Sequence, residues 1–257
     1  MRPEEPDFLY SPGRTGRENY LARIHYILLN LIIPESGKRI FRIPGEQRVA
    51  RVVKRENRFV CSVMLDDQLR IAHLHDPGRL MDLIYPGNSI LVRESHGMKT
   101  DLSITAALRN KEWILTDSRF HNQIAAGFLQ GEVQREVTLG KSRLDFKVGN
   151  AYVEVKGCSM LDGDVATFPD APTARGKHHL ELLTDLIHKG LETMLIVLVF
   201  SHDSRCFSPN FKTDPGFSMA FRNFLDEGGG VFIPKFRFLE PYLVFHGVIN
   251  TCENAFG

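Results

Sequence analysis

The segment that decides the fold of the second half of the chain reads RLDFKVGNAYVEVK, from Arg143 to Lys156. Gly149-Asn150 is a two-residue hairpin turn of the glycine-first kind, and apolar and polar residues alternate on both sides of it. This turn fixes the register of two antiparallel strands, in which Asp145 lies directly opposite Glu154. The alternation predicts an apolar face of Leu144, Phe146, Val148, Ala151, Val153 and Val155, and a polar face of Asp145, Lys147, Tyr152, Glu154 and Lys156.

Two carboxylates that face each other across a hairpin repel, because directly opposed side chains are only about 5 Å apart at Cβ. Asp145 and Glu154 therefore need either a compensating cation or a raised pKa. The cation is Lys147, Lys156 or a divalent metal, and the two carboxylates offer the oxygen ligands that Mg²⁺ and Mn²⁺ prefer. The alternative is a solvated sheet face on which the lysines balance the acids. The charge pattern alone does not choose between these interpretations.

The preceding strand contributes a third acid, Glu136. If Gly140-Lys141 is a two-residue turn, Glu136 lies opposite Asp145 and three acids cross three neighbouring strands. If the loop also includes Ser142, the register slips by one residue and Glu136 is offset. Both registers remain open from the sequence.

The rest of the second half alternates helices with strands. Helices are predicted over residues 118–130, 173–189 and 216–227, and strands over 133–139, 143–148, 151–156, 194–200 and from 231 onward. The strand over 194–200 is apolar throughout, which indicates burial on both faces. This order predicts an α/β domain with a mixed sheet over residues 117–257.

The first half has the rhythm of a small β domain. Strands are predicted over residues 59–65, 69–74, 89–93, 102–108 and 113–116, separated by turn residues such as Pro77-Gly78 and Pro86-Gly87. Five short strands in so short a span predict a barrel or sandwich over residues 45–116, with an OB-type barrel as one candidate. Residues 1–44 form an N-terminal extension with one amphipathic helix over 17–32. The chain is thus expected to be a two-domain α+β and α/β protein.

Composition is that of a globular protein, with 43% hydrophobic and 25% charged residues among 257, which excludes disordered, collagenous and coiled-coil classes. The formal net charge is only +1, but the charge is unevenly distributed. Residues 38–58 carry eight basic against two acidic side chains, a net charge of +6. A basic segment hidden in a balanced chain is typical of a surface that binds nucleic-acid phosphates.

The cysteines and the apolar segments bear on the cellular compartment. Cys61, Cys158, Cys206 and Cys252 have no paired spacing and form no CxxC motif, which favours a reduced, cytoplasmic protein without a zinc site. The longest apolar stretch near the N-terminus, residues 24–33, is too short to span a bilayer. No membrane association is expected.

Several segments together resemble one protein family. The matching segments are Arg58-Phe59, residues 72–80, Pro86-Gly87, residues 135–137, residues 142–146, residues 153–156, Phe168-Pro169-Asp170-Ala171, Thr173, Arg175-Gly176 and His179-Leu180. They resemble the sugar fermentation stimulation protein A (SfsA) family, and Asp145 followed by Glu154-Val155-Lys156 looks like the D…ExK signature of PD-(D/E)XK nucleases. The resemblance implies an N-terminal OB-type domain that binds DNA and a C-terminal domain of nuclease fold. The family is also associated with regulation of sugar metabolism genes.

The resemblance implies metal-assisted phosphodiester hydrolysis at the hairpin. Asp145 and Glu154 are expected to hold Mg²⁺ or Mn²⁺, with the carbonyl oxygen of Val155 as a third ligand in one arrangement. Lys156 is expected to position the attacking water or contact the phosphate, and Glu136 to supply a further carboxylate.

Four further residues are candidates for contact with nucleic acid: Arg58, Arg79, Arg175 and His179. Arg175 and His179 lie on a predicted helix that Thr173 caps, so capping and packing alone also explain part of that pattern. Asn122 and Gln123 either face the site or pack a helix on the sheet. His73, His75 and Asp76 form a less favoured metal-site pattern, Phe59 serves stacking or the core, and Trp113 is expected in the core.

Three function classes follow, in order. The first is a metal-dependent nuclease that acts on DNA or RNA, and the second is a non-catalytic DNA-binding regulator of sugar metabolism genes. Paired acids favour the first, because acids without a metal would repel a phosphate backbone. The third, a sugar- or nucleotide-metabolising enzyme, finds no phosphate loop or dinucleotide fingerprint. A homodimer is neither required nor excluded.

Overall fold

The computed structural model describes residues 31–95, 100–253 and 255. Its first half is a closed five-stranded barrel, because β4 pairs with both β3 and, in parallel, β6. The barrel strands are β2 (Arg48–Arg55), β3 (Val60–Leu65), β4 (Gln68–His73), β5 (Ser89–Glu94) and β6 (Leu102–Arg109). The OB-type barrel expected from the sequence is therefore confirmed.

One barrel strand was not predicted, and one predicted strand lies outside the barrel. β2 falls in the basic segment, where only Ala50 and Val52 point inward and six of eight residues are partly or fully exposed. So weak an apolar alternation gave no strand signal. β7 (Glu112–Leu115) instead leaves the barrel and joins it to the second half.

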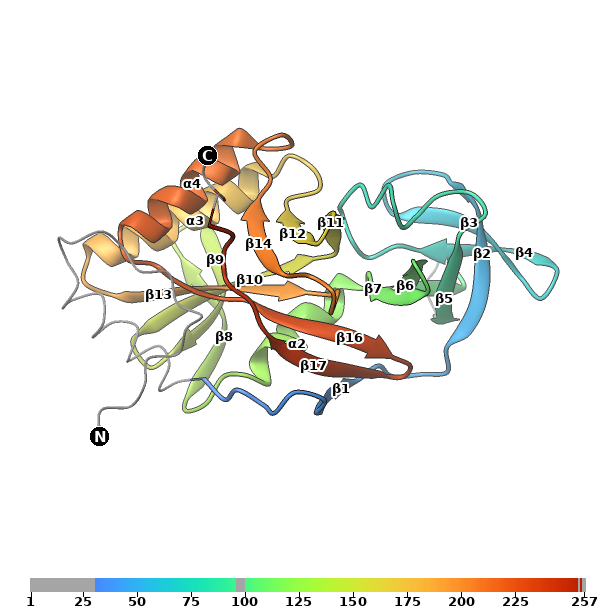
Figure 1. Ribbon diagram of the computed structural model, residues 1–257, viewed down its shortest axis with the longest axis horizontal. Helices are drawn as coiled ribbons and strands as arrows, with labels where there is room; N and C mark the ends of the chain where they lie inside the picture. Colours follow the sequence, from blue (N-terminus) through green and yellow to red (C-terminus); the bar gives the residue numbers. More distant parts are fainter. Residues whose placement is uncertain (1–30, 96–99, 254, 256–257) are drawn as a thin grey trace.

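The sheet continues without a break from the barrel into the second half (Figure 1). β7 pairs with β6 on one side and, through Trp113 opposite Phe238, with β16 on the other. From there the order runs β16 (Pro234–Leu239), β13 (Glu192–Val199), β10 (Ala151–Cys158), β9 (Ser142–Val148) and β8 (Val133–Leu139). β10 and β13 are parallel whereas β8, β9 and β10 form an antiparallel meander, so the predicted mixed sheet is present.

The remaining strands complete the edges. β17 (Tyr242–Val248) pairs with β16 and with β1 (Arg39–Arg42), while β15 (Gly230–Phe232) pairs with β13. A separate sheet comprises β11 (Met160–Asp162), β12 (Val165–Phe168) and β14 (Cys206–Pro209). The predicted helix over 17–32 lies outside the described residues except for its end, where Leu31 bridges to Leu129.

Helices cover both faces of the sheet (Figure 1). α3 (Ala174–His188) and α4 (Pro215–Asp226) pack together on one face, each with its first turn capped by a side-chain oxygen, from Thr173 and Asp214 respectively. The short η1 (Ser118–Phe120) and α2 (His121–Ala126) pack on the other face, where one apolar core extends from the barrel into the second half. The predicted helix over 118–130 is thus shorter than expected.

The hairpin register is confirmed for the three pairs nearest the turn, Val148 with Ala151, Lys147 with Tyr152 and Phe146 with Val153. The assignment of faces is wrong for Leu144, which packs into the core beneath α3 and α4, the opposite core from Phe146. Tyr152 lies on the predicted face, opposite Phe146, but there it is buried in the same core as Leu144 and not on a polar surface. Val137, the partner of Leu144, packs against the same core as Leu144. The expected strict alternation therefore fails between Leu144 and Phe146.

The expectation of four reduced cysteines is wrong for two of them. Cys206 and Cys252 form a disulfide, whereas Cys61 and Cys158 are free and buried. Hydrogen bonds between β14 and the C-terminal segment bring the pair together: the Phe207 N–H binds the Asn250 carbonyl, and the Cys252 N–H binds the Phe207 carbonyl. Backbone pairing across 46 residues leaves no spacing motif, so the sequence could not reveal the disulfide. The expected cytoplasmic location loses the support it drew from the cysteines.

Within residues 31–95, 100–253 and 255, no helix is long and apolar enough to cross a bilayer.

Candidate active site

The two hairpin acids lie together, with their carboxylates held in different ways. Asp145 on β9 accepts hydrogen bonds at both oxygens, from Asn122 Nδ2 (2.8 Å) and from the backbone N–H of Val155 (2.8 Å). Glu154 on β10 is 3% exposed, and only its Oε1 is bonded. Its other oxygen, Oε2, is buried without a hydrogen-bond partner among the described residues.

Lys156 and His179 share the bonded oxygen of Glu154. Lys156 Nζ donates to Oε1 at 2.5 Å from two residues further along β10, and His179 Nδ1 contacts the same oxygen from α3. Arg175, one turn earlier on the exposed side of α3, donates from Nε to His179 Nε2 at 3.5 Å. The structure therefore brings Arg175 and His179 to the hairpin acids.

The surroundings shift the pKa values of the two acids in opposite directions. Burial raises the pKa of Asp145 above its ordinary value, and the nearby charge of Glu154 raises it further. Burial alone would also raise the pKa of Glu154, but the Lys156 ammonium and the hydrogen bond from His179 hold it below its ordinary value. The site thus keeps one acid ionised and makes the ionised form of its neighbour costly, a state that a bound cation would relieve.

For Asn122, the sequence did not decide between a place in the site and a role in packing the helix on the sheet. It lies in the first turn of α2 and its amide reaches Asp145 Oδ1, while the neighbouring Gln123 is exposed. His121, just before it, packs against β10 so closely that a Cβ on Gly157 would lie 2.1 Å from the His121 ring. α2 is therefore fitted to the hairpin at two adjacent residues.

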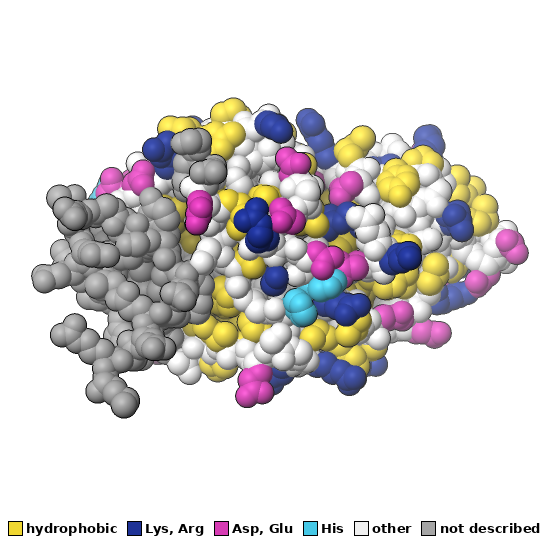
Figure 2. Space-filling model, in the orientation of Figure 1, with side chains coloured by type: hydrophobic (Ala, Val, Ile, Leu, Met, Phe, Trp, Pro, Cys, Tyr) yellow, Lys and Arg dark blue, Asp and Glu magenta, His cyan; other side chains and the backbone are white. Residues whose placement is uncertain are grey.

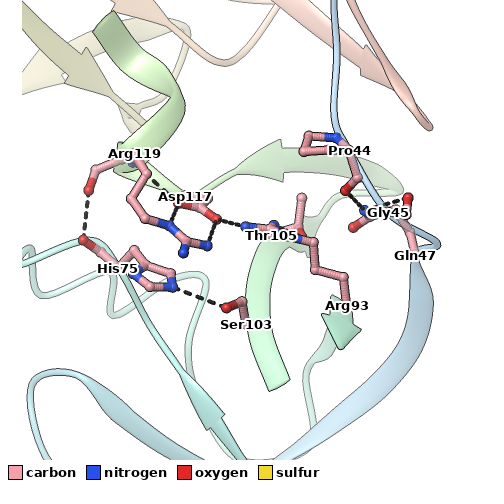
Figure 3. A network of polar contacts seen from close by, with 10 residues as sticks. Pro44, Gly45, Gln47, His75, Arg93, Ser103, Thr105, Asp117 and Arg119 are labelled. Carbon is pink, nitrogen blue, oxygen red and sulfur yellow. Dashed lines mark hydrogen bonds and ion pairs between the residues drawn. The ribbon is translucent and has the colours of Figure 1, made fainter. Parts of the chain in front are cut away.

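A buried ionic network anchors the start of this helix to the barrel (Figure 3). Asp117 is fully buried and receives Arg93 from β5 at 2.6 Å and Arg119 from η1 at 2.8 Å. Burial would raise the pKa of Asp117, but hydrogen bonds from Arg119 and Arg93 hold it below its ordinary value. Ser118 Oγ also donates to the carbonyl oxygen of His75 at 2.6 Å. The network therefore fixes η1, and with it the start of α2 and Asn122, relative to the barrel.

Glu136 lies in register with the site, but its side chain turns elsewhere. β8 and β9 pair with Leu139 opposite Ser142, so the Gly140-Lys141 turn has two residues. Glu136 itself has φ of +53° and forms an ion pair with Arg143 at 3.1 Å, and its side chain is 61% exposed. Its contribution as a further carboxylate stays a prediction.

The barrel residues predicted to bind nucleic acid surround a turn at the edge of the second half. Arg58 Nε donates to the Pro77 carbonyl at 2.6 Å, and Arg79 is exposed in the same turn. Asp170, far away in sequence, accepts the Leu80 N–H at 2.9 Å and so ties the turn to the second half. Between them lies a cleft of about 120 Å³. The contact between Asp170 and Leu80 spans 90 residues, which no local motif could reveal.

The histidine pattern in the barrel has a structural explanation. His75 Nε2 lies 3.1 Å from Ser103 Oγ, Asp76 accepts the Gly78 N–H, and the His73 ring lies parallel to Phe59. Burial lowers the pKa of His75 to about 4. The less favoured metal site at His73, His75 and Asp76 gains no support. Among the described residues, the potential metal ligands that converge are Glu112, His202 and Asp203. Trp113, expected in the core, is partly buried and packs against it.

A second polar cluster lies where β7 joins the second half, and the sequence gave no signal for it. Ligand atoms of Glu112, His202 and Asp203 all lie within 4.8 Å of one another. His202 contacts both acids, and Arg237 lies 3.9 Å from Glu112. These ion pairs account for the cluster as a link between β7 and the loop after β13.

Comparison with known proteins agrees with this architecture. Residues 53–116 match the family model described as the SfsA N-terminal OB domain, and residues 111–240 match the sugar fermentation stimulation protein RE domain. The fold is similar to that of Pyrococcus furiosus SfsA, solved in complex with Ca²⁺, with a TM-score of 0.78 and 22% identity over 84% of this chain and 99% of that one.

Similarity to curated relatives is stronger. A sugar fermentation stimulation protein homolog of Saccharolobus solfataricus is 48% identical over 219 residues, which cover 85% of this chain and 91% of the relative. The homolog of Thermoplasma volcanium is 46% identical over 202 residues, 79% of this chain and 93% of the relative. The chain belongs to the sugar fermentation stimulation protein (SfsA) family.

Proposed function

We propose that this protein is a metal-dependent nuclease that hydrolyses phosphodiester bonds in DNA or RNA at the β9–β10 hairpin. The observation that carries the proposal is the meeting of Asp145, Glu154 and Lys156 at one site, with a buried oxygen of Glu154 left without a hydrogen-bond partner among the described residues. A purely structural ion pair would satisfy that oxygen, since an unpaired buried acceptor costs about 1–3 kcal/mol.

The donor set fits a hard divalent cation. Asp145 and Glu154 offer carboxylate oxygens, and the raised pKa of Asp145 reflects in part the charge of Glu154, which a cation would offset. The fold neighbour from Pyrococcus furiosus is a Ca²⁺ complex, and Ca²⁺ also takes oxygen ligands. When bound, Mg²⁺ or Mn²⁺ supplies a water of lowered pKa and stabilises charge on the phosphate.

The other residues of the site would act on the phosphate and its nucleophile. Lys156 is held by Glu154 with its side chain 16% exposed, so it can position the attacking water or contact a phosphate oxygen. His179 fixes Glu154 from α3, and Arg175 brings a positive charge to the edge of the same site. Glu136 stays a candidate further carboxylate that would have to leave Arg143.

The barrel would bind the nucleic acid. OB-type barrels commonly bind oligonucleotides. Of the expected contacts, Arg58 lines the cleft between the barrel and the second half, and Arg79 is exposed in the turn beside it. The basic β2 supplies further positive charge for the phosphate backbone. The alternative, a non-catalytic DNA-binding regulator, would use this surface and leave the hairpin acids idle.

The test incubates purified protein with labelled single- and double-stranded DNA and RNA in Mg²⁺, Mn²⁺ or EDTA. We expect cleavage that requires a metal and is abolished in Asp145→Asn and Lys156→Ala. Gln123→Ala, beside Asn122 but exposed, is the matched control and should cleave like the wild type. Binding without cleavage, unchanged in the hairpin variants, would refute the nuclease and favour the regulator.

A further inference from the structure

An aromatic side chain is exposed on the barrel surface, next in sequence to Arg58, which lines the cleft. Phe59 is 40% exposed. The plane of its ring makes an angle of 6° with that of His73, and the two ring centroids are 6.2 Å apart. The guanidinium of Arg58 lies over the Phe59 ring, 5.7 Å from its centroid. An unpaired base would stack on this partly exposed ring beside the guanidinium or in its place, because bases and guanidinium groups both bind aromatic faces.

Two arginines near this ring bond to neutral groups. Arg55 and Arg58 donate to backbone carbonyl oxygens, at 2.8 Å to Gly78 and 2.6 Å to Pro77 respectively. Carbonyl oxygens fix a guanidinium without cancelling its charge. On the barrel half of the face shown in Figure 2, exposed hydrophobic, basic and acidic side chains are interspersed. An aromatic ring beside arginines can hold bases and phosphates at once.

Arg58 connects this surface to the catalytic hairpin through the cleft. It lines the cleft together with Pro77 and Gly78 from the barrel, opposite Gly157, Ser159 and Thr173 from the second half. Gly157 directly follows Lys156, and Thr173 caps the helix that carries His179. A strand that leaves Phe59 along Arg58 would therefore reach the hairpin acids through the cleft.

The chemistry of the cleft suits a base better than a phosphate. Met160, Pro169 and Pro172 contribute apolar surface. Asp76 and Asp170 also line the cleft, each with one carboxylate oxygen bonded to a backbone N–H, of Gly78 and Leu80 respectively. Carboxylates repel phosphate but accept hydrogen bonds from the amino groups of bases. In a duplex those amino groups are paired and the bases are stacked on their neighbours. Only an unpaired base can enter.

We propose that Phe59 and the cleft between the barrel and the second half form a binding track for single-stranded nucleic acid, with bases stacked on Phe59 and one base in the cleft next to Lys156. This inference rests on the proposed nuclease function and specifies its substrate as an unpaired strand. Phosphates follow the arginines of β2 and of the turn after it, and the cleft admits the strand to the hairpin.

The test measures binding by fluorescence anisotropy in EDTA, so that it is independent of cleavage. The ligands are a labelled 15-nucleotide single strand of DNA, the same strand as RNA, its blunt DNA duplex, and a strand with abasic sites that keeps the phosphates. We expect the wild-type chain to bind a single strand about 5- to 150-fold more tightly than the abasic strand, the range expected for one stacked base. The duplex should also bind more weakly, and the tighter of the DNA and RNA strands identifies the sugar preferred.

Two pairs of variants assign the track to residues. Phe59→Ala should lose the preference for bases, and Phe59→Tyr should keep it because the ring is retained. Leu69→Ala removes an apolar side chain that is 62% exposed on the same barrel and should bind like the wild type. Ser159→Trp should fill the cleft and weaken single-strand binding, whereas Ser159→Ala should not.

The inference is overturned if the duplex binds as tightly as the single strand, or if Phe59→Ala weakens the abasic strand as much as the intact one. If the wild-type chain binds single strands but cleaves none of the substrates with Mg²⁺ or Mn²⁺, the proposed nuclease function is refuted and the proposed binding track is not. Metal-dependent cleavage with no preference for unpaired bases would refute the track alone.

Discussion

At the residue scale, Asn122 decides how Asp145 presents its carboxylate. Its amide donates to Oδ1, the oxygen that the Val155 N–H does not reach. Removing a group that orients a metal ligand typically weakens metal binding or activity by about 10- to 100-fold. We therefore expect Asn122→Ala to weaken Mn²⁺ binding by about 10-fold or more, measured by calorimetry, while Gln123→Ala binds normally. Equal affinity in Asn122→Ala and the wild type would show that Val155 alone orients Asp145.

Gly157 shows how closely α2 fits the hairpin. A Cβ at this position would lie within 3 Å of three atoms of the His121 ring, so alanine overpacks the contact. Overpacking a well-filled site costs about 1–3 kcal/mol. Gly157→Ala should lower the free energy of unfolding by this amount in urea denaturation. Combining it with His121→Ala should cost less than the two single changes added together, and strict additivity would mean that the ring is not the obstacle.

At the scale of elements, the turn after β4 carries a buried acid that opposes stability at neutral pH. Burial raises the pKa of Asp76 from 3.8 to about 6. Because the folded state then holds this proton more tightly than the unfolded state, its contribution to stability is greatest below pH 3.8 and is lost as the pH rises through 6. A shift of about two units corresponds to roughly 3 kcal/mol.

Asp76→Asn removes this titration and keeps an oxygen for the Gly78 N–H. We expect the variant to gain roughly 2.5 kcal/mol relative to the wild type when the pH is raised from 4 to 7.5, measured as the difference in free energy of unfolding. All other titrations cancel in that difference. A constant difference across the pH range would contradict the assignment.

The elements also show what the sequence could predict. The meander β8–β10, α3, β13 and α4 follow from local periodicity and turn chemistry, because their apolar stripes are long and their ends are marked by caps or glycines. β2 gave no signal because its outer face is largely basic, and after the break at 228–230 one strand was predicted where the structure has β15, β16 and β17. Of the site, the hairpin acids were predictable from local pattern, whereas the contact of His179 with Glu154 depends on how α3 packs on the sheet. The contact of Asp170 with Leu80 and the disulfide depend on the tertiary fold.

At the scale of the whole molecule, the barrel and the second half share one sheet and one apolar core. Trp113, the only tryptophan, lies opposite Phe238 where the two halves join. Its fluorescence therefore reports on the junction. We expect the fluorescence and far-ultraviolet circular dichroism transitions in urea to coincide, because the halves unfold as one cooperative unit. A fluorescence transition that precedes loss of secondary structure would show that the halves separate first.

The proposed site requires Asp145 and Glu154 to hold a divalent cation jointly. Titration of Mn²⁺ into the full chain by calorimetry tests it most directly, with Asp145→Asn and Glu154→Gln beside the wild type. Asp185→Asn is the control, because Asp185 is an exposed acid on α3. We predict one binding event in the wild type and in Asp185→Asn, and none in either hairpin variant. If Asp145→Asn binds Mn²⁺ as tightly as the wild type does, Asp145 is not a metal ligand.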